Sequence, residues 1–312
     1  MKHIVITGAT SMIGVALIEA ALAGNEVERI YAVVRPGTKK IGRIPKNSRV
    51  HIVACGLSAY ETLPKLIDGP CEVFYHLAWP RRETYQESFE DVCDKIESVR
   101  AELIAVKAAK ELGCSKFIGA GSQSEYGVVY AEKLSPSLPC NPVRADGILK
   151  FAAGKLAEIQ AENYGMSYIW MRIFSVYGRY DRPNSMISTT IHKLHHKEHC
   201  AFTPSQQMWD YLNIEDLGSA LYLAGKFSAG HKVYCVGSGD ERPLYEFIET
   251  IRDVVDPTAK LGIGELPYPQ NPVMRLCADI SDLQRDTGWK PQVQFEDGIR
   301  KLYRQMIGDG IL

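Results

Sequence analysis

The sequence predicts an α/β protein in which a doubly wound parallel sheet is followed by a smaller C-terminal α/β domain. Short runs of β-type residues alternate with helical stretches through the first half of the chain, a pattern typical of parallel sheets. These runs carry few polar residues, as expected of strands that helices cover on both faces. The 312 residues suffice for one large unit or two packed domains.

The first domain is predicted over residues 1–174. Its strands share a nearly continuous apolar pattern and are expected at residues 3–7, 29–34, 49–54, 71–79, 116–122 and 167–174. The main helices between them are expected at residues 13–23, 89–112 and 147–163. In such folds the carboxyl ends of the parallel strands form the crevice in which ligands bind.

The second domain is predicted over residues 175–312, where the alternation of strands and helices becomes irregular. Residues 175–185 are rich in turn-forming side chains, and residues 186–197 have a helical pattern. A short extended run that leads into a helix is expected over residues 210–225. The segment HKVYCVG follows at residues 231–237, and a further helix is expected over residues 244–254. We expect this domain to pack against the open edge of the sheet, with some of its segments packed back on the first domain.

Composition argues against several classes of partner. A formal net charge of −1 provides no basic surface for nucleic acid, and acidic residues interrupt the apolar runs before they reach membrane-spanning length. The N-terminus leads into a strand and a glycine turn, not into the apolar core of a signal peptide, so we expect a cytoplasmic protein. The eight cysteines show no C-x-x-C spacing and are predicted to be reduced. Two H-x-x-x-H spacings within residues 192–199 have no evident third ligand, so we predict an exposed polar helix and no metal site.

A glycine-rich turn, TGATSMIG at residues 7–14, joins the first predicted strand to the first predicted helix. Gly8 permits a tight turn, and Gly14 permits close packing of the helix on the strand. Backbone N–H groups at the start of such a helix face the pyrophosphate of a dinucleotide. Ser11 stands where the usual pattern has a middle glycine. The position directly after the first strand favours a dinucleotide-binding, Rossmann-type domain, and a turn without a ligand is the alternative.

A basic residue, Arg35, follows the second predicted strand where NAD-preferring sites place an acidic one. Lys39 and Lys40 come shortly after it. Because a basic residue suits the additional phosphate of NADP, the sequence favours NADP over NAD as the cofactor. An exposed basic loop without a ligand is the alternative interpretation.

Six motifs in a fixed order give the chain a resemblance to a known family. They are TGATSMIG (7–14), YHLAW (75–79), GAGSQSEYG (119–127), DGILK (146–150), RIFSVYG (172–178) and DYLNIED (210–216). In these motifs the chain resembles the extended short-chain dehydrogenase/reductase superfamily and, more narrowly, the NAD-dependent epimerase/dehydratase family. The resemblance implies an NAD(P)-dependent epimerase, dehydratase or reductase that acts on a nucleotide sugar. It also implies a homodimer built from the helices predicted at residues 89–112 and 147–163.

The resemblance further implies roles for individual residues. Together with Arg35, the residues predicted to contact the cofactor are Thr7, Gly8, Thr10, Ser11, Met12, Ile13, Gly14, His76, Leu77, Ala78, Lys150, Ile173 and Phe174. The residues predicted to contact the substrate are Ser122, Ser175, Arg179, Arg182 and Arg275. Arginine suits this role because its guanidinium binds phosphate oxygens in a bidentate manner. The predicted catalytic residues are Ser122, Asp146, Lys150 and Tyr126.

Asp146 is the main departure from the family pattern, because the family has its catalytic tyrosine at this position, four residues before the lysine. An aspartate is shorter than a tyrosine, so its carboxylate does not reach the same substrate oxygen without a bridging water. Three interpretations stay open. Asp146 forms an ion pair with Lys150 one helical turn away, or it works in an altered active site through water, or Tyr126 or Glu125 replaces the tyrosine as acid and base.

Other departures weaken the match further: Gly56 stands at a position that is commonly acidic, Ser98 and Ser175 at positions where asparagine is common, and Trp209 where many members carry an arginine. A protein that binds the cofactor without catalysis, as a sensor or partner subunit, is therefore the alternative function. A reductase of a different small carbonyl compound is a third possibility.

Overall fold

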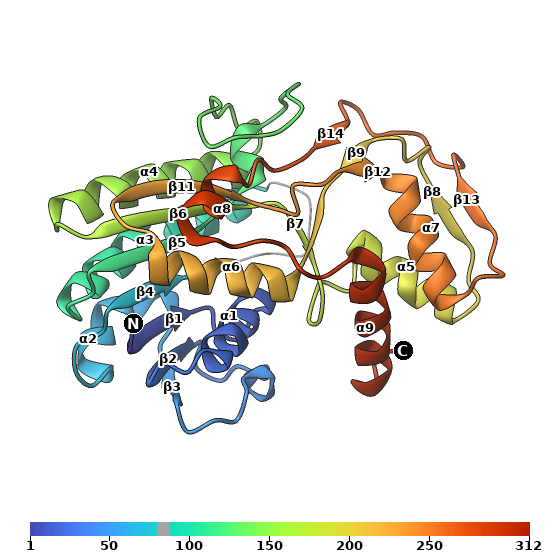
Figure 1. Cartoon of the computed structure of the whole chain (residues 1–312). Helices are drawn as coiled ribbons and strands as arrows, with labels where there is room; N and C mark the ends of the chain where they lie inside the picture. The colour runs from blue at the N-terminus through green and yellow to red at the C-terminus, as the bar shows by residue number, and fades with distance from the viewer. Residues whose placement is uncertain (80–87) are drawn as a thin grey trace.

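The computed structural model describes residues 1–79 and 88–312 of the chain (Figure 1). Its main sheet has seven strands in the order β3-β2-β1-β4-β5-β6-β11, and every neighbouring pair is parallel. The bounds are β1 His3–Thr7, β2 Arg29–Val34, β3 Val50–Ala54, β4 Val73–His76, β5 Lys116–Ser122, β6 Ser167–Ile173 and β11 His231–Val236. The predicted α/β fold with a doubly wound parallel sheet is therefore confirmed.

The sheet gains its seventh strand from the second half of the chain. β11 pairs with β6 from His231 opposite Tyr168 to Val236 opposite Ile173. The apolar pattern at residues 231–237 identifies a strand, but it does not identify the neighbour to which that strand bonds. The chain thus returns to the first sheet after it has left it at the end of β6.

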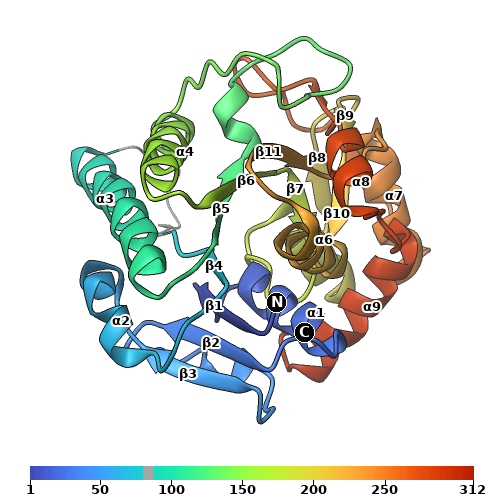
Figure 2. The same cartoon turned by 60° about the vertical axis from the view of Figure 1, so that its left-hand side comes forward.

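Helices cover both faces of the sheet (Figure 2). The helix α3 lies beside α4 on one face, and α1 lies beside α6 on the other. The bounds of these helices are α1 Met12–Ala23, α3 Phe89–Glu111, α4 Ala145–Asn163 and α6 Ile214–Phe227. Alternate residues of β1 show the two layers, since Ile4 and Ile6 pack in the α1–α6 core and Val5 packs in the α3–α4 core. Shorter helices near this sheet are α2 Leu63–Leu66, α8 Ser281–Thr287 and the 3₁₀ turns η1 Ile41–Arg43, η2 Leu57–Thr62 and η3 Gln123–Tyr126.

A smaller group of elements, mostly from residues 175–312, packs around its own apolar cluster beside the carboxyl ends of the sheet (Figure 1). Its helices are α5 Met186–His195, α7 Leu244–Val255 and α9 Phe295–Gly308. Its short strands are β7 Ser175–Tyr177, β8 Cys200–Phe202, β9 Met208–Trp209, β10 Tyr211–Asn213, β12 Arg242–Pro243, β13 Leu261–Ile263 and β14 Arg275–Leu276. Among the described residues, no helix combines the length and the apolarity that crossing a membrane requires.

Buried Asp210 joins the segments at the junction between the two groups of elements. Its carboxylate accepts hydrogen bonds from the Ser238 hydroxyl and from the backbone N–H groups of Ser238, Gly239 and Ala278. Burial raises the pKa of this carboxyl, whereas the four donors lower it. Asp210 thus ties the start of β10 to the segments that follow β11 and β14.

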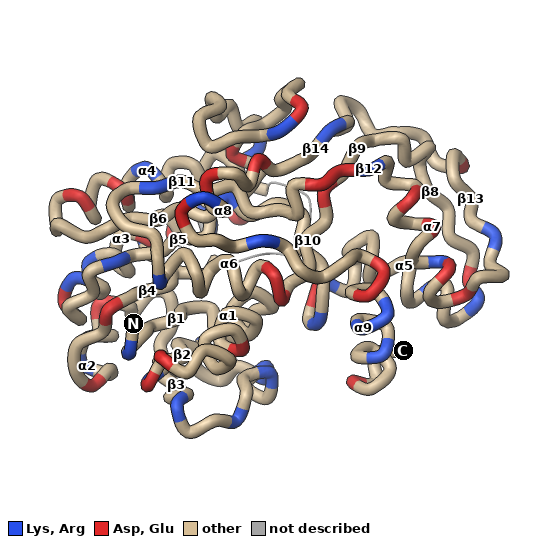
Figure 3. The backbone as a smooth tube through the Cα atoms, in the orientation of Figure 1, with Lys and Arg blue, Asp and Glu red and all other residues tan. Residues whose placement is uncertain are grey.

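Acidic and basic residues are interspersed over most of the chain, and the connection between β2 and β3 is a basic exception (Figure 3). Residues 35–49 contain six Lys or Arg residues and no Asp or Glu. This connection begins at the carboxyl end of β2, beside the end of β1 at which the glycine turn lies, and returns to the amino end of β3, which is parallel to β2.

Candidate active site

The glycine turn between β1 and α1 has the geometry that its sequence predicts. Gly8 has a positive φ of 66°, and a Cβ added there would lie 2.8 Å from the Ala78 nitrogen. A Cβ added at Gly14 would lie 2.8 Å from the Ala9 Cα. Both positions therefore require glycine, the first because of its backbone conformation and both because neighbouring backbone approaches closely.

Ser11 is the N-cap of α1, and its hydroxyl accepts a hydrogen bond of 3.0 Å from the Gly14 N–H. The N–H groups of Met12 and Ile13, in the first turn of the helix, have no partner within the helix because of their position. They are the groups that a pyrophosphate would bind. The turn thus fits a dinucleotide, although Ser11 already uses one of the donors that a middle glycine would leave open.

Thr7 and His76 connect this turn to the end of β4. The Thr7 hydroxyl oxygen accepts hydrogen bonds from the backbone N–H groups of Leu77 and Ala78, at 3.2 and 3.3 Å. The same hydroxyl lies 2.9 Å from Nδ1 of His76. These bonds fix residues 77 and 78, which the resemblance assigns to the nicotinamide ribose.

His76 faces a buried carboxyl on its other side. Its Nε2 lies 3.6 Å from Oε2 of Glu102, on α3, and both side chains are buried. Burial lowers the pKa of His76 to about 3 and raises the pKa of Glu102 to about 7. The Lys150 ammonium contributes to the first shift and opposes the second.

Lys150 is buried in α4, where its ammonium lies over the ring of Trp79. The distance from Nζ to the ring centroid is 3.7 Å, and the Trp170 ring lies at 5.7 Å. A cation in contact with an aromatic face is stabilised by the ring quadrupole, more strongly when it is desolvated. Trp79 therefore holds the ammonium at the end of β4, beside the residues expected to meet the nicotinamide ribose.

Asp146 pairs with α3 instead of with its own helix. Its carboxylate lies 3.1 Å from Nζ of Lys95, whereas no ion pair among the described residues joins it to Lys150. The side chain of Asp146 is 53% exposed and that of Lys95 only 12%. The interpretation as an ion pair with Lys150 is thus wrong, and a half-exposed carboxylate stands at the start of α4.

Ser122 ends β5 and begins the turn η3. Its hydroxyl oxygen accepts hydrogen bonds from the N–H and the hydroxyl of Ser124, at 3.2 and 2.9 Å. The side chain is only partly buried. Its own hydroxyl proton can therefore be donated to a ligand in the crevice.

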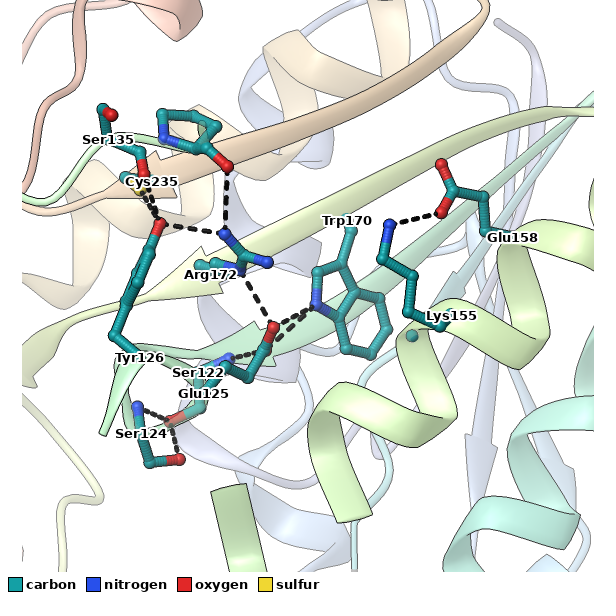
Figure 4. A network of polar contacts seen from close by, with 12 residues as sticks. Ser122, Ser124, Glu125, Tyr126, Ser135, Lys155, Glu158, Trp170, Arg172 and Cys235 are labelled. Carbon is teal, nitrogen blue, oxygen red and sulfur yellow. Dashed lines mark hydrogen bonds and ion pairs between the residues drawn. The ribbon is translucent and has the colours of Figure 1, made fainter. Parts of the chain in front are cut away.

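Glu125 and Tyr126 belong to a buried polar network that holds η3 against β6 (Figure 4). Glu125 accepts hydrogen bonds from the Ser122 N–H, from the Trp170 indole and from Nε of Arg172, which lies 2.9 Å away. The Tyr126 hydroxyl accepts from Arg172 and donates to the Ser135 carbonyl. Burial raises the pKa of Tyr126 far above its ordinary value. This environment does not favour either residue as the replacement acid and base.

The predicted substrate residues divide into two groups. Ser175 lies in β7, just after β6, and its hydroxyl accepts a hydrogen bond of 3.0 Å from the Trp209 indole. Arg179 forms a bidentate pair with Asp309 at 2.6 and 2.9 Å, and Arg275 pairs with Glu241. Arg182 is exposed. The structure thus brings Ser175 to the crevice, whereas carboxylates already engage two of the three arginines.

The order of strands brings these groups to one edge of the sheet. The carboxyl ends of β1, β4, β5 and β6 lie there, and the strand order changes direction between β1 and β4, which is where doubly wound folds have their ligand-binding crevice. The predicted residues that end or directly follow these strands are Thr7, Gly8, Thr10, Ser11, Met12, Ile13, Gly14, His76, Leu77, Ala78, Ser122, Ile173, Phe174 and Ser175, with Lys150 reaching in from α4.

A sequence model of the NAD dependent epimerase/dehydratase family matches residues 4–237. The chain belongs to this family. It is 29% identical over 151 residues to CDP-abequose synthase of Salmonella muenchen, a match that spans 47% of this chain and 51% of that protein. It is 23% identical over 316 residues to a putative UDP-glucose 4-epimerase of Methanocaldococcus jannaschii, spanning 97% and 98% of the two proteins. UDP-glucuronic acid 4-epimerase from Bacillus cereus, solved in complex with NAD, has a TM-score of 0.83 at 22% identity, over 98% of this chain and 99% of that chain.

Membership of the epimerase/dehydratase family makes the protein an NAD(P)-dependent enzyme of the extended short-chain dehydrogenase/reductase type. The family and the cofactor class predicted from the motifs are confirmed. The comparisons do not favour the alternative of a cofactor-binding protein without catalysis. The individual site residues stay predictions.

Sequence reasoning missed three residues of the site: Glu102, Trp79 and Lys95. Glu102 left a signal, because it stands at helical spacing from Ala105 and Ala109 on the buried face of α3. A carboxylate on such a face is rare and needs a partner or a raised pKa. Trp79 and Lys95 left no comparable signal, since neither the sequence position nor the pattern shows which side chain each contacts.

Proposed function

We propose that the protein is an NAD(P)-dependent epimerase, dehydratase or reductase that acts on a nucleotide sugar. The observation that carries the proposal is the crevice at which a pyrophosphate-binding turn, a partly buried Ser122 and the Lys150 ammonium occur together. The names of two relatives, a CDP-abequose synthase and a putative UDP-glucose 4-epimerase, support a nucleotide sugar as the substrate.

The chemistry of such a reaction assigns a task to each residue. When it is bound, the dinucleotide accepts or returns a hydride at its nicotinamide ring. The chain must hold the reacting hydroxyl, which Ser122 does through its free proton, and must move the hydroxyl proton as the bond to carbon changes. Asp146, half exposed at the start of α4, would accept that proton through a bridging water. Trp79 keeps the Lys150 ammonium beside the expected ribose.

The preference for NADP is part of the proposal. Arg35 is exposed directly after β2, and it begins the connection of residues 35–49 that has six basic residues and no acidic one. A phosphate on the adenosine ribose would be attracted to this connection.

The structure also supports proposals about assembly and location. Partly exposed apolar side chains of α3 and α4, among them Ile96, Ile148 and Ile159, suit a homodimer through these two helices. All eight cysteines lie in the described part of the chain and are free thiols, which suits the reducing cytoplasm.

Calorimetric titration of NAD⁺, NADH, NADP⁺ and NADPH tests the proposal first. We expect NADP(H) to bind more tightly than NAD(H), and Arg35→Asp to weaken NADP(H) at least tenfold more than NAD(H). Nucleotide sugars are then screened for conversion that requires the bound cofactor. A protein that binds none of the four dinucleotides at millimolar concentration would contradict the proposed function, and equal losses for both cofactors would contradict only the role of Arg35.

A further inference from the structure

Glu102 and His76 meet in the protein interior without the hydrogen bonds that buried polar groups normally have. Both carboxyl oxygens of Glu102 and Nε2 of His76 are buried and have no hydrogen-bond partner among the residues that the structure describes. Their separation of 3.6 Å is too long for a hydrogen bond. Such unsatisfied groups are rare in folded proteins and often mark a functional site.

The hydrogen bonds of Thr7 fix the proton on the histidine ring. The N–H groups of Leu77 and Ala78 occupy both lone pairs of the Thr7 oxygen, so its hydroxyl proton points to Nδ1 of His76. Nδ1 is therefore an acceptor, and the proton of the neutral ring sits on Nε2. Nε2 faces Glu102, so the imidazole presents a donor to the carboxyl group.

Charged and titratable groups from five elements of the described chain interact with Glu102. They are His76 of β4, Lys150 of α4, Glu125 of η3, Tyr60 of η2 and Tyr168 of β6. Burial and Glu125 favour the protonated carboxyl, whereas the Lys150 ammonium favours the carboxylate. The tyrosines stay neutral because burial raises their pKa values. Arg172 pairs with Glu125 and offsets its charge.

The net charge at the nicotinamide end of the crevice therefore depends on one proton. Ionisation of Glu102 adds one negative charge to this region, near the Lys150 ammonium that lies on Trp79. Protonation of Glu102 removes that charge. An oxidised nicotinamide carries a positive charge and a reduced one is neutral, so the two forms respond differently to this change.

We propose that Glu102 is a positioning residue of the cofactor site whose carboxylate favours the oxidised dinucleotide and whose protonated form favours the reduced one. The inference rests on the proposed binding of a nicotinamide dinucleotide. Binding of the oxidised form then moves the Glu102 proton to the solvent, while binding of the reduced form leaves it in place. No covalent bond to the cofactor is involved.

Titrations of NAD⁺ and NADH into the protein and into Glu102→Gln, at pH 6, 7 and 8, test this inference. The result is expressed as the ratio of the two dissociation constants, because a group whose titration affects both ligands equally does not change this ratio. Since the pKa of Glu102 is raised to about 7, the carboxyl is mostly protonated at pH 6 and mostly ionised at pH 8. We expect the affinity for NAD⁺ relative to that for NADH to rise about five- to tenfold from pH 6 to pH 8. One linked proton changes this ratio of affinities by at most about tenfold per pH unit.

The variant and a matched control decide the outcome. In Glu102→Gln the ratio of the two dissociation constants should change less than twofold between pH 6 and pH 8. Glu111→Gln, at an exposed position on the same helix, should show the pH dependence of the unchanged protein. A Glu102→Gln protein that keeps the original pH dependence would overturn the inference. If NAD⁺ and NADH do not bind, the same ratio is measured with NADP⁺ and NADPH. Failure of all four dinucleotides to bind the unchanged protein would instead overturn the proposed function, and the inference with it.

If Glu102→Gln does not fold, infrared spectroscopy of the unchanged protein tests the inference instead. The C=O stretch of a buried, protonated carboxylic acid should be present at pH 6 and should weaken when NAD⁺, but not NADH, is added. A band that NAD⁺ leaves unchanged would overturn the inference without any variant.

Discussion

Asp146 is the residue on which the proposed chemistry depends most at the scale of single residues. The resemblance predicts a tyrosine at this position, and this chain has a shorter carboxylate that pairs with Lys95 and is half exposed. Carboxylates accept protons readily, but they are poor donors at neutral pH because their ordinary pKa is about 4. A reaction that must return the proton as well as remove it is therefore slow with Asp146 alone.

We expect Asp146→Tyr to raise kcat on a converted nucleotide sugar at least tenfold, with the Kd of the cofactor changed less than twofold. A phenol at this position would reach the crevice, and the Lys150 ammonium, one helical turn away, would lower its pKa. Steady-state kinetics and calorimetry measure the two quantities. Asp146→Asn is the matched control, because it removes the charge without adding reach. Loss of turnover in both variants would show instead that the Asp146 carboxylate itself carries the proton.

The sequence predicts the residues of the cofactor turn better than it predicts the side chains that face them. Gly8 and Gly14 are recognisable because a positive φ and a close backbone approach restrict the residue type at those positions themselves. The partners of Arg179 and His76 are not recognisable in this way. Asp309 and Glu102 reach them only through the fold, from positions far along the chain.

The helix α1 shows a trade-off at the scale of an element. Its N-cap Ser11 satisfies the Gly14 N–H, and thereby stabilises the helix start, but it occupies a donor that faces the crevice. A cap of this kind typically contributes about 1 kcal/mol relative to alanine and a few tenths relative to glycine. The departure from the usual glycine pattern therefore favours the stability of the fold over the affinity for a pyrophosphate.

Replacement of Ser11 separates these two effects. Ser11→Gly should lower the free energy of unfolding by only a few tenths of a kcal/mol and Ser11→Ala by about 1 kcal/mol. Only the glycine variant removes the Cβ as well as the hydroxyl, so it should bind the cofactor several-fold more tightly than the alanine variant. Urea unfolding and calorimetry measure the two quantities. Equal affinities of the two variants would show that the side chain at residue 11 does not limit the approach of the pyrophosphate.

The elements themselves follow closely from the sequence, with one informative difference. Strands predicted at residues 3–7, 29–34 and 116–122 form with those bounds because buried parallel strands need continuous apolar runs. The apolar residues of the segment at 231–237 suit a strand, but they do not predict its place beside β6. Strand pairing depends on which edge the folded chain leaves open, and no local pattern records that.

At the scale of the whole molecule, the exposed apolar side chains of α3 and α4 are the feature that bears on assembly. Ile148, Leu156 and Ile159 lie on the solvent-facing side of α4, and Ile96 is exposed on α3 beside it. Apolar patches that combine residues of two adjacent helices are typical of interfaces between proteins. A homodimer through this face would bury them while leaving the crevice at the ends of the strands open, since helices α3 and α4 cover one face of the sheet (Figure 2).

We expect the protein to have the mass of a dimer in light scattering after size-exclusion chromatography, and Ile159→Lys to shift it to the mass of a monomer. A lysine ammonium buried in an apolar interface without a partner loses its hydration and gains nothing in return. Ile52→Lys is the control, because Ile52 is similarly exposed but lies on β3, at the edge of the sheet far from α4. A dimer that persists in Ile159→Lys would place the interface elsewhere, and an unchanged protein that is already monomeric would remove the dimer from the proposal. Cofactor affinity should be equal in both variants, because neither position lies at the crevice.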